Sequence, residues 1–122
     1  MFIELLQQDG ICILRFHGRL ASAAQLEYLE DKLEEIRGHP AQCMLADLHE
    51  VDSIGSMGLG FIVQVFKSAT KRPGGRFMLA GANPRVRRAF EVTRLSEVIP
   101  MAEDVTSALG ALRSGASAAG KK

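Results

Sequence analysis

The feature that most constrains the fold is a nearly continuous apolar run at residues 42–48, Gln-Cys-Met-Leu-Ala-Asp-Leu. A strand with one face in water alternates apolar and polar residues, whereas a run of this kind is typical of an inner strand covered on both faces. Stretches with helical periodicity lie before and after the run. The sequence therefore predicts a layered α/β domain that contains this strand in its interior.

The remaining strands are marked by short β-rich runs and by turn residues. Asp9-Gly10 separates the first two runs and predicts a hairpin, and Gly18 is expected to end the second strand. A turn-rich stretch at residues 49–56 follows the apolar run. The predicted strands cover residues 2–7, 11–17, 42–48 and 76–80, with a short apolar piece at 98–101 as the optional fifth.

About four helices are expected, and three of them have a recognisable N-cap. These caps are Ser22, Asn83 and Asp104, and Pro84 takes the first helical position after Asn83. The helices are expected between Ser22 and Gly38, and at about residues 57–70, 84–92 and 105–112. The order β-β-α-β-α-β-α-(β)-α implies a mixed sheet of four to five strands with a parallel core. Periodicity leaves open whether the helices cover one face or both.

Length and composition fit a single domain. The chain has 122 residues, of which 47% are hydrophobic and 24% charged, as in an ordinary globular protein. We assign residues 1–112 to the domain and 113–122 to a disordered tail. No apolar run approaches the ~20 residues of a membrane-spanning helix, and the first residues do not resemble a secretory signal. A cytoplasmic protein without a membrane span is expected.

Charge is unevenly distributed along the chain. Residues 1–61 carry four basic and ten acidic side chains, whereas residues 62–122 carry eleven basic and four acidic ones. The basic half is either a surface for nucleic acid or another anionic partner, or a set of solvated helix faces. Aromatic residues are not interleaved with the basic ones as base stacking would require. We therefore expect no nucleic-acid partner.

The patterns of the common enzyme classes are absent from the sequence. The three histidines have no metal-ligand spacing with Cys12 or Cys43, and both cysteines lie in predicted apolar strands. The glycine-rich segment at residues 55–60 matches neither the phosphate-binding loop nor the dinucleotide fingerprint. We therefore expect no catalytic residue, no metal and no cofactor. Because these patterns are absent, a nucleotide-binding enzyme is the weaker hypothesis.

The turn before the second predicted helix carries the most specific signal. Gly55 allows a positive φ, and Ser56 stands where a helix N-cap would stand. Gly58 and Gly60 would let another surface approach the start of the helix closely. From these residues alone, Ser56 is either a simple cap or a group presented to a partner.

The segment around this turn resembles the signature of STAS domains, which include the bacterial anti-sigma factor antagonists. In that family an apolar strand ends in Asp-Leu, and a short loop leads to Asp-Ser-Ser/Thr-Gly-Leu-Gly at the start of a helix. Here Asp47-Leu48 ends the apolar run, and Ile54-Gly55-Ser56-Met57-Gly58-Leu59-Gly60 opens the helix. Further matches, in the same order as in the family, are Gly18-Arg19-Leu20, residues 75–79, residues 83–88, Thr93-Arg94-Leu95 and Val98-Ile99-Pro100.

The resemblance implies a regulatory module rather than an enzyme. In the family, the first serine of the signature is phosphorylated by a partner that is both a serine kinase and an anti-sigma factor, and the phosphorylated form no longer binds it. By position this serine is Ser56. The partner-binding residues implied by the match are Ile54, Gly55, Ser56, Met57, Gly58 and Leu59.

The chain departs from the family pattern at three positions. Gly55 and Ala21 replace acidic residues, and Met57 replaces the second serine or threonine. Asp47 or Asp52 are candidates to supply the missing carboxylate in space. The alternative function is a STAS scaffold without phosphorylation, or a soluble subunit associated with a transporter.

Overall fold

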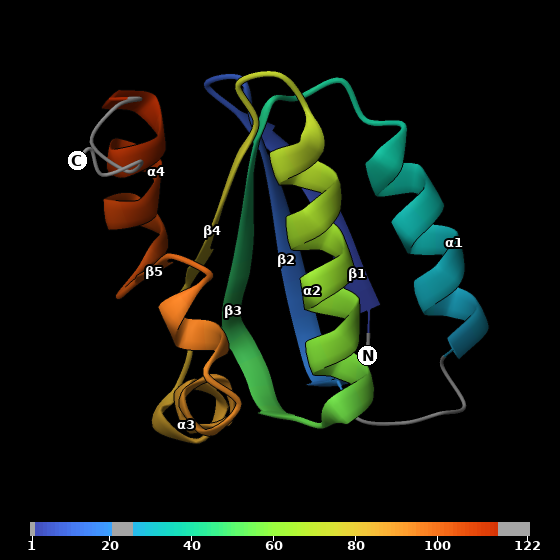
Figure 1. Ribbon diagram of the computed structural model, residues 1–122, viewed down its shortest axis with the longest axis vertical. Coiled ribbons are helices and arrows are strands. Elements are labelled where there is room, and N and C mark those ends of the chain that lie inside the picture. Colours follow the sequence, from blue (N-terminus) through green and yellow to red (C-terminus); the bar gives the residue numbers. More distant parts are fainter. Residues whose placement is uncertain (1, 21–25, 115–122) are drawn as a thin grey trace.

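The computed structural model describes residues 2–20 and 26–114 and shows a five-stranded sheet with helices packed against it (Figure 1). The strands are β1 (Phe2–Gln8), β2 (Ile11–Leu20), β3 (Cys43–Ile54), β4 (Arg76–Ala80) and β5 (Met101–Ala102). The helices are α1 (Leu26–Arg37), α2 (Ser56–Lys71), α3 (Pro84–Val92) and α4 (Val105–Ser114), with a short 3-10 helix, η2 (Leu95–Glu97). The predicted α/β class and the order of elements are confirmed.

The sheet is mixed, with the strands in the order β1-β2-β3-β4-β5. β1 and β2 pair antiparallel, and every other neighbouring pair is parallel. Asp9 and Gly10 both have positive φ, +53° and +78°, as a two-residue hairpin turn of type I′ requires. The hairpin and the parallel core are as the sequence predicts.

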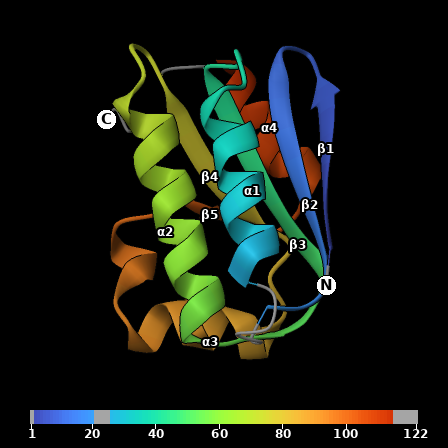
Figure 2. The same ribbon diagram turned by 90° about the vertical axis from the view of Figure 1, so that its right-hand side faces the viewer.

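Helices cover both faces of the sheet, which periodicity could not decide. Figures 1 and 2 show α1 and α2 together on one face, α4 on the other, and α3 at one end of the sheet. In β3, Met44 belongs to the core cluster on the α1–α2 side, and the adjacent Leu45 belongs to the cluster on the α4 side. Because consecutive strand residues point to opposite faces, β3 is buried on both faces, as expected.

Three strands differ from the prediction: β5 (Met101–Ala102) begins only at the last residue of the piece expected at 98–101, and β2 and β3 run further than expected. β2 continues through Gly18 to Leu20, and β3 continues to Ile54 through most of the stretch that was expected to be a turn. The two extensions pair with each other, with Leu20 opposite Ile54, after register shifts near His17 and Gly18. The turn-forming residues are held in a strand because a partner strand satisfies their backbone groups, which local sequence cannot reveal.

The capping predictions are confirmed where the structure describes them. The Asn83 side chain accepts a hydrogen bond from the Val86 backbone N–H at 2.8 Å, with Pro84 at the helix start. Asp104 Oδ1 accepts from the Ser107 N–H at 2.8 Å. Ser22 and Ala21 lie outside the described residues. So do residues 115–122 of the expected tail, although α4 itself runs to Ser114.

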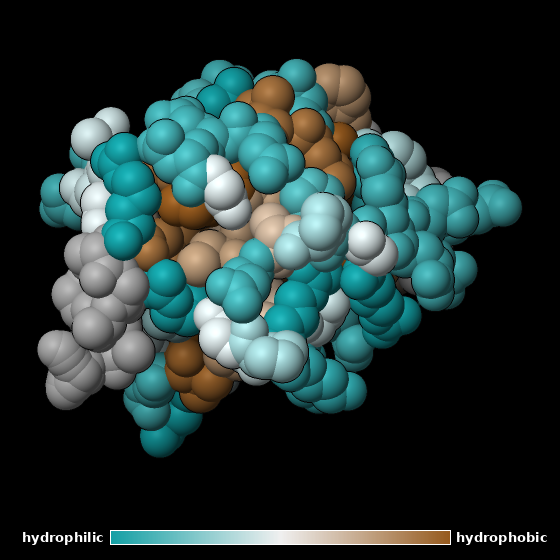
Figure 3. Space-filling view, turned by 90° about the horizontal axis from the view of Figure 1, so that it is seen from above, coloured by the Kyte–Doolittle hydropathy of each residue, from teal (hydrophilic) through white to brown (hydrophobic). Residues whose placement is uncertain are grey.

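The end of the sheet opposite α3 carries a shallow cavity of about 420 Å³. It lies between the β1–β2 hairpin, the segment before β3 and the end of α4, with Pro40, Cys43 and Leu112 in its lining. Seen from above, this end shows apolar atoms among hydrophilic side chains (Figure 3). Cys43 is half-buried there, whereas Cys12 is fully buried in the core.

Candidate functional site

Ser56 is exposed and is the first residue of α2. The N-cap is Gly55, with φ −108° and ψ −173°, and no side chain caps the helix. Of the two interpretations of Ser56, the simple cap is thus wrong, and Gly55 does not use the positive φ that a glycine allows. The direct connection from β3 needs only extended backbone at Gly55, so the helix starts one residue earlier than expected. The Ser56 hydroxyl is therefore not used to cap the helix.

The backbone around Ser56 forms the positive end of a sixteen-residue helix. The first intrahelical bond runs from the Leu59 N–H to the Gly55 carbonyl at 2.9 Å, so the amides of the first turn precede the helical ladder. No acidic side chain lies in this first turn. A negative charge on the Ser56 oxygen would lie next to the partial positive charge of the helix end.

The neighbours of Ser56 face partly inward. Ile54, Met57 and Leu59 are half-buried and pack against the core on the α1–α2 side. Gly58 is buried, so it does not offer the close approach to another surface that the sequence suggested. Gly60 is exposed, and a Cβ built on it would meet no atom within 4 Å. Ser56 and Gly60 are thus the openly accessible positions of this segment.

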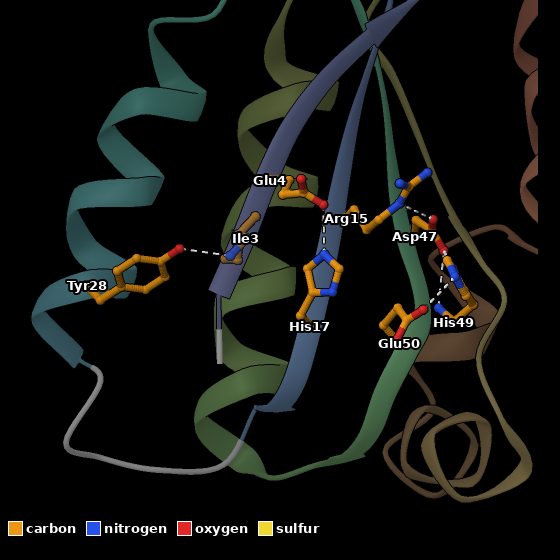
Figure 4. A network of polar contacts seen from close by, with 8 residues as sticks. All are labelled: Ile3, Glu4, Arg15, His17, Tyr28, Asp47, His49 and Glu50. Carbon is orange, nitrogen blue, oxygen red and sulfur yellow. Dashed lines mark hydrogen bonds and ion pairs between the residues drawn. The ribbon is translucent and has the colours of Figure 1, made fainter.

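Asp47 does not stand near Ser56, contrary to one interpretation of the sequence. It is fully buried and follows Leu45 by two residues, so it points to the α4 side of β3. Its carboxylate accepts hydrogen bonds from Arg15 Nε at 3.0 Å, from the His49 backbone N–H at 3.1 Å, and from the His49 ring at 2.7 Å (Figure 4).

These contacts set the ionisation of Asp47. Burial by itself would raise its pKa, but the hydrogen bonds from His49 and Arg15 outweigh burial and hold the pKa below the usual value. His49 in turn contacts Glu50 through Nε2 at 3.1 Å, and on the same side of the sheet His17 contacts Glu4 at 2.8 Å. The sequence signal for this network was the charged Asp47 inside the apolar run at residues 42–48. The Asp47 network has a structural role in β3.

Asp52 is closer to Ser56 in the sequence than Asp47 is, and it is exposed. The Asn83 side chain donates to the carbonyl oxygens of Val51 and Asp52 at 3.1 and 3.2 Å. Asn83 therefore ties the end of β3 to the start of α3, and Asp52 and Arg85 line one shallow cavity at this junction. Sequence reasoning missed this tie, because it treated Asn83 only as a cap.

The described residues offer little other chemistry. Within residues 2–20 and 26–114, no group of three or more His, Cys, Asp or Glu side chains is arranged to hold a metal ion. In the same ranges, no helix has the length and apolar character needed to cross a membrane. Burial raises the pKa of the Cys12 thiol to about 11, which makes it a poor nucleophile.

A family model for the STAS domain matches residues 2–108. The chain belongs to the STAS domain family. An anti-sigma-B factor antagonist of Listeria monocytogenes is 32% identical to this STAS domain over 97 residues, which are 80% of this chain and 84% of the relative. Two Thermotoga relatives are 36% and 33% identical over 66 residues, but the chain spans only 58% of the length of each.

Several solved structures have a similar fold. An anti-sigma factor antagonist from Mycobacterium paratuberculosis superposes with a TM-score of 0.82 at 21% identity, covering 92% of this chain and 93% of that one. The unphosphorylated form of the anti-sigma factor antagonist SpoIIAA gives 0.74 at 18% identity, with 93% and 97% coverage. Its phosphorylated form gives 0.66 at 17% identity, with 91% and 99% coverage. At these identities the superpositions show that the fold is shared.

Proposed function

We propose that this STAS domain is a cytoplasmic anti-sigma factor antagonist that binds an anti-sigma factor with serine kinase activity, and that phosphorylation of Ser56 releases the partner. The family membership and the name of the Listeria relative support the antagonist role. The observation that carries the switch is the exposed Ser56 hydroxyl at the first position of α2, which no capping interaction occupies. Solved structures of the fold neighbour SpoIIAA in a phosphorylated and an unphosphorylated form support the proposal.

The physical basis of the switch is a difference between the free and the bound protein. A phosphoserine carries about −1.5 to −2 charges at pH 7. In the free protein this charge is tolerated at the positive end of α2, where it is worth about 0.3–1 kcal/mol of stabilisation. In a packed interface the phosphate loses its water, and a penalty of about 3–4 kcal/mol lowers the affinity several hundred-fold.

The phosphoryl transfer needs groups that this part of the chain does not provide. The Ser56 oxygen forms a bond to the γ-phosphorus of ATP, the bond to the β-phosphate oxygen breaks, and ADP leaves. Position 55 is a glycine, Asp47 faces the other side of the sheet, and Asp52 lines the cavity at the start of α3 with Asn83 and Arg85. The kinase partner therefore supplies the group that accepts the hydroxyl proton.

A second candidate function keeps the fold without the switch. Gly55 and Met57 stand where the family pattern has an acidic residue and a hydroxyl residue, which favours a constitutive scaffold or a transporter-associated subunit. This alternative predicts that the protein takes up no phosphoryl group when incubated with the kinase and ATP.

The experiment compares Ser56→Asp, Ser56→Ala and the wild type for binding to the anti-sigma factor that co-purifies with the unmodified chain. We expect Ser56→Asp to lose binding at unchanged thermal stability, and Ser56→Ala to bind but to take up no phosphoryl group by intact mass. Thr106→Asp is the matched control, because Thr106 is exposed in the first turn of α4. Equal binding by wild type and Ser56→Asp would exclude the switch.

A further inference from the structure

A groove lies between α1 and α2, next to the Ser56 turn. Figure 2 shows the two helices side by side over the sheet. Leu29 and Leu33 of α1 and Met57 and Phe61 of α2 line the groove, whose volume is about 330 Å³. Met57 directly follows Ser56 and is one of the positions at which this chain departs from the family pattern. An apolar, adaptable side chain thus replaces a hydroxyl residue at the mouth of the groove.

The groove is open because Gly60 forms part of its wall. A Cβ at Gly60 would meet no atom within 4 Å, so a larger residue would fit without disturbing the fold. Glycine inside a helix is unfavourable relative to alanine. Local stability therefore does not explain the glycine, whereas access to the groove does.

The α1 side of the groove carries negative charge. Glu30 lines the groove, and Glu27 is exposed about one turn earlier on the same helix. Glu34 and Glu35 pair with Arg37 and Lys32 at the other end of α1, whereas Glu30 forms no ion pair with any residue in the described part of the chain. The facing residues 56–66 of α2 carry no charge, and the cations Lys67 and Lys71 lie beyond Gln64, where they line a separate cavity with Arg37. An apolar occupant flanked by cations complements this surface.

We propose that the α1–α2 groove receives a helical segment of the partner, with an aliphatic side chain in the groove and Lys or Arg residues beside Glu30. This mode is that of an amphipathic helix in an apolar groove. The inference rests on the proposed function, because it names a second contact of the same partner. The groove and Ser56 are separate contacts. Phosphorylation changes the contact at the start of α2, whereas the groove binds the partner's apolar and basic side chains.

The direct test uses a synthetic probe rather than the natural partner. The probe is a capped amphipathic helical peptide with leucines four residues apart and flanking lysines. A second peptide carries glutamates in place of the lysines. We expect the lysine peptide to shift the amide NMR signals of Gly60 and of α1, and to bind at least ten-fold more tightly than the glutamate peptide. Equal binding of both peptides, or shifts confined to the α4 face, would overturn the proposal.

Matched variants locate the binding. Gly60→Gln fills the groove and should weaken the binding of the lysine peptide at least ten-fold. Gly110→Gln, at an equally open site in α4, should not change that binding. Glu30→Gln should remove most of the preference for lysine over glutamate. Unchanged binding by Gly60→Gln would contradict the proposal. So would a wild-type dimer that Gly60→Gln dissociates, because the occupant would then be a second copy of this chain.

The same variants separate this proposal from the phosphorylation switch. The peptide engages only the groove, so it should bind Ser56→Asp at least as well as the wild type. Gly60→Gln and Ser56→Asp should each, independently of the other, weaken the binding of the full anti-sigma factor. If only Gly60→Gln weakens the binding of the anti-sigma factor, the groove proposal is supported and the Ser56 switch is excluded. If only Ser56→Asp does so, the groove proposal is overturned.

Discussion

Arg72 Nη2 donates a hydrogen bond to the carbonyl oxygen of Ile36 at 2.7 Å, which joins the end of α2 to the last turn of α1. The same guanidinium also donates to the carbonyl oxygens of Arg37, His39 and Ala41. These carbonyls lie at and beyond the C-terminus of α1, where intrahelical donors are missing. One side chain therefore fixes the spacing of the two helices that form the groove.

Replacing Arg72 should destabilise the protein clearly. We expect Arg72→Ala to lower the free energy of unfolding by at least about 2 kcal/mol, since hydrogen bonds to charged groups contribute about 1.5–3 kcal/mol each. Arg72→Lys should recover only part of the loss, because an ammonium group lacks the planar fork. Urea unfolding measures both, with the exposed Lys71→Ala as the control. Equal stability of Arg72→Ala and Lys71→Ala would contradict the assigned role.

Two glycines should respond to alanine in opposite ways. Gly60→Ala should stabilise the protein by up to about 1 kcal/mol, because alanine favours a helix interior and its Cβ meets nothing. Gly75→Ala should cost more than about 2 kcal/mol, because its Cβ would lie 1.9 Å from the Ala69 carbonyl oxygen and force the backbone to move. Thermal melts compare the two, and a destabilised Gly60→Ala would show that the groove is not open.

Asp47 should contribute to stability in a pH-dependent way. Its pKa is lower in the folded protein, so its contribution is complete above the unfolded pKa, about 4, and is lost as the pH falls through the folded value. We expect Asp47→Asn to be less stable by about 2 kcal/mol at neutral pH. Its stability should also fall less steeply than that of the wild type below about pH 4. Parallel stability curves for the two proteins in acid would refute this assignment.

Asn83 should act as more than a helix cap. Asn83→Ser keeps an oxygen for the Val86 N–H but loses the donors to Val51 and Asp52. We expect Asn83→Ala to lower the free energy of unfolding by about 1–2 kcal/mol. Asn83→Ser should lower it by a smaller but measurable amount. Hydrogen exchange should show faster exchange at the end of β3 in Asn83→Ser. Unchanged exchange there would limit Asn83 to its capping role.

The two cysteines should differ in reactivity. Burial raises the pKa of Cys12 to about 11, so about one thiol in a thousand is ionised at pH 8, even before access is considered. Cys43 is half-buried. Iodoacetamide at pH 8 should modify Cys43 first, and both cysteines only in urea, as peptide mass spectrometry can show. Modification of Cys12 first in the native protein would contradict its burial.

Local patterns were sufficient for most of the elements. The strand at residues 76–80, the helix at 84–92 and its Asn83 cap lie where the sequence predicts them, because each rests on interactions within a few residues. The site was found through its resemblance to a family signature, and the exposure of Ser56 agrees with that hypothesis. The cap role of Ser56 was wrong, because the position of a helix start depends on how the preceding strand ends.

The sequence by itself determined the α/β class and the order of the elements, since periodicity and capping are short-range properties, and its resemblance to a family signature drew attention to Ser56. Only the tertiary structure decided that β3 extends to Ile54, that Asp47 turns away from Ser56, and that a groove opens between α1 and α2. These features depend on pairing and packing between residues far apart in the chain. The pattern of a single sequence does not say which distant segments pair or pack together. Only the three-dimensional structure identifies the strand that pairs with the end of β3 and the helix that faces α2.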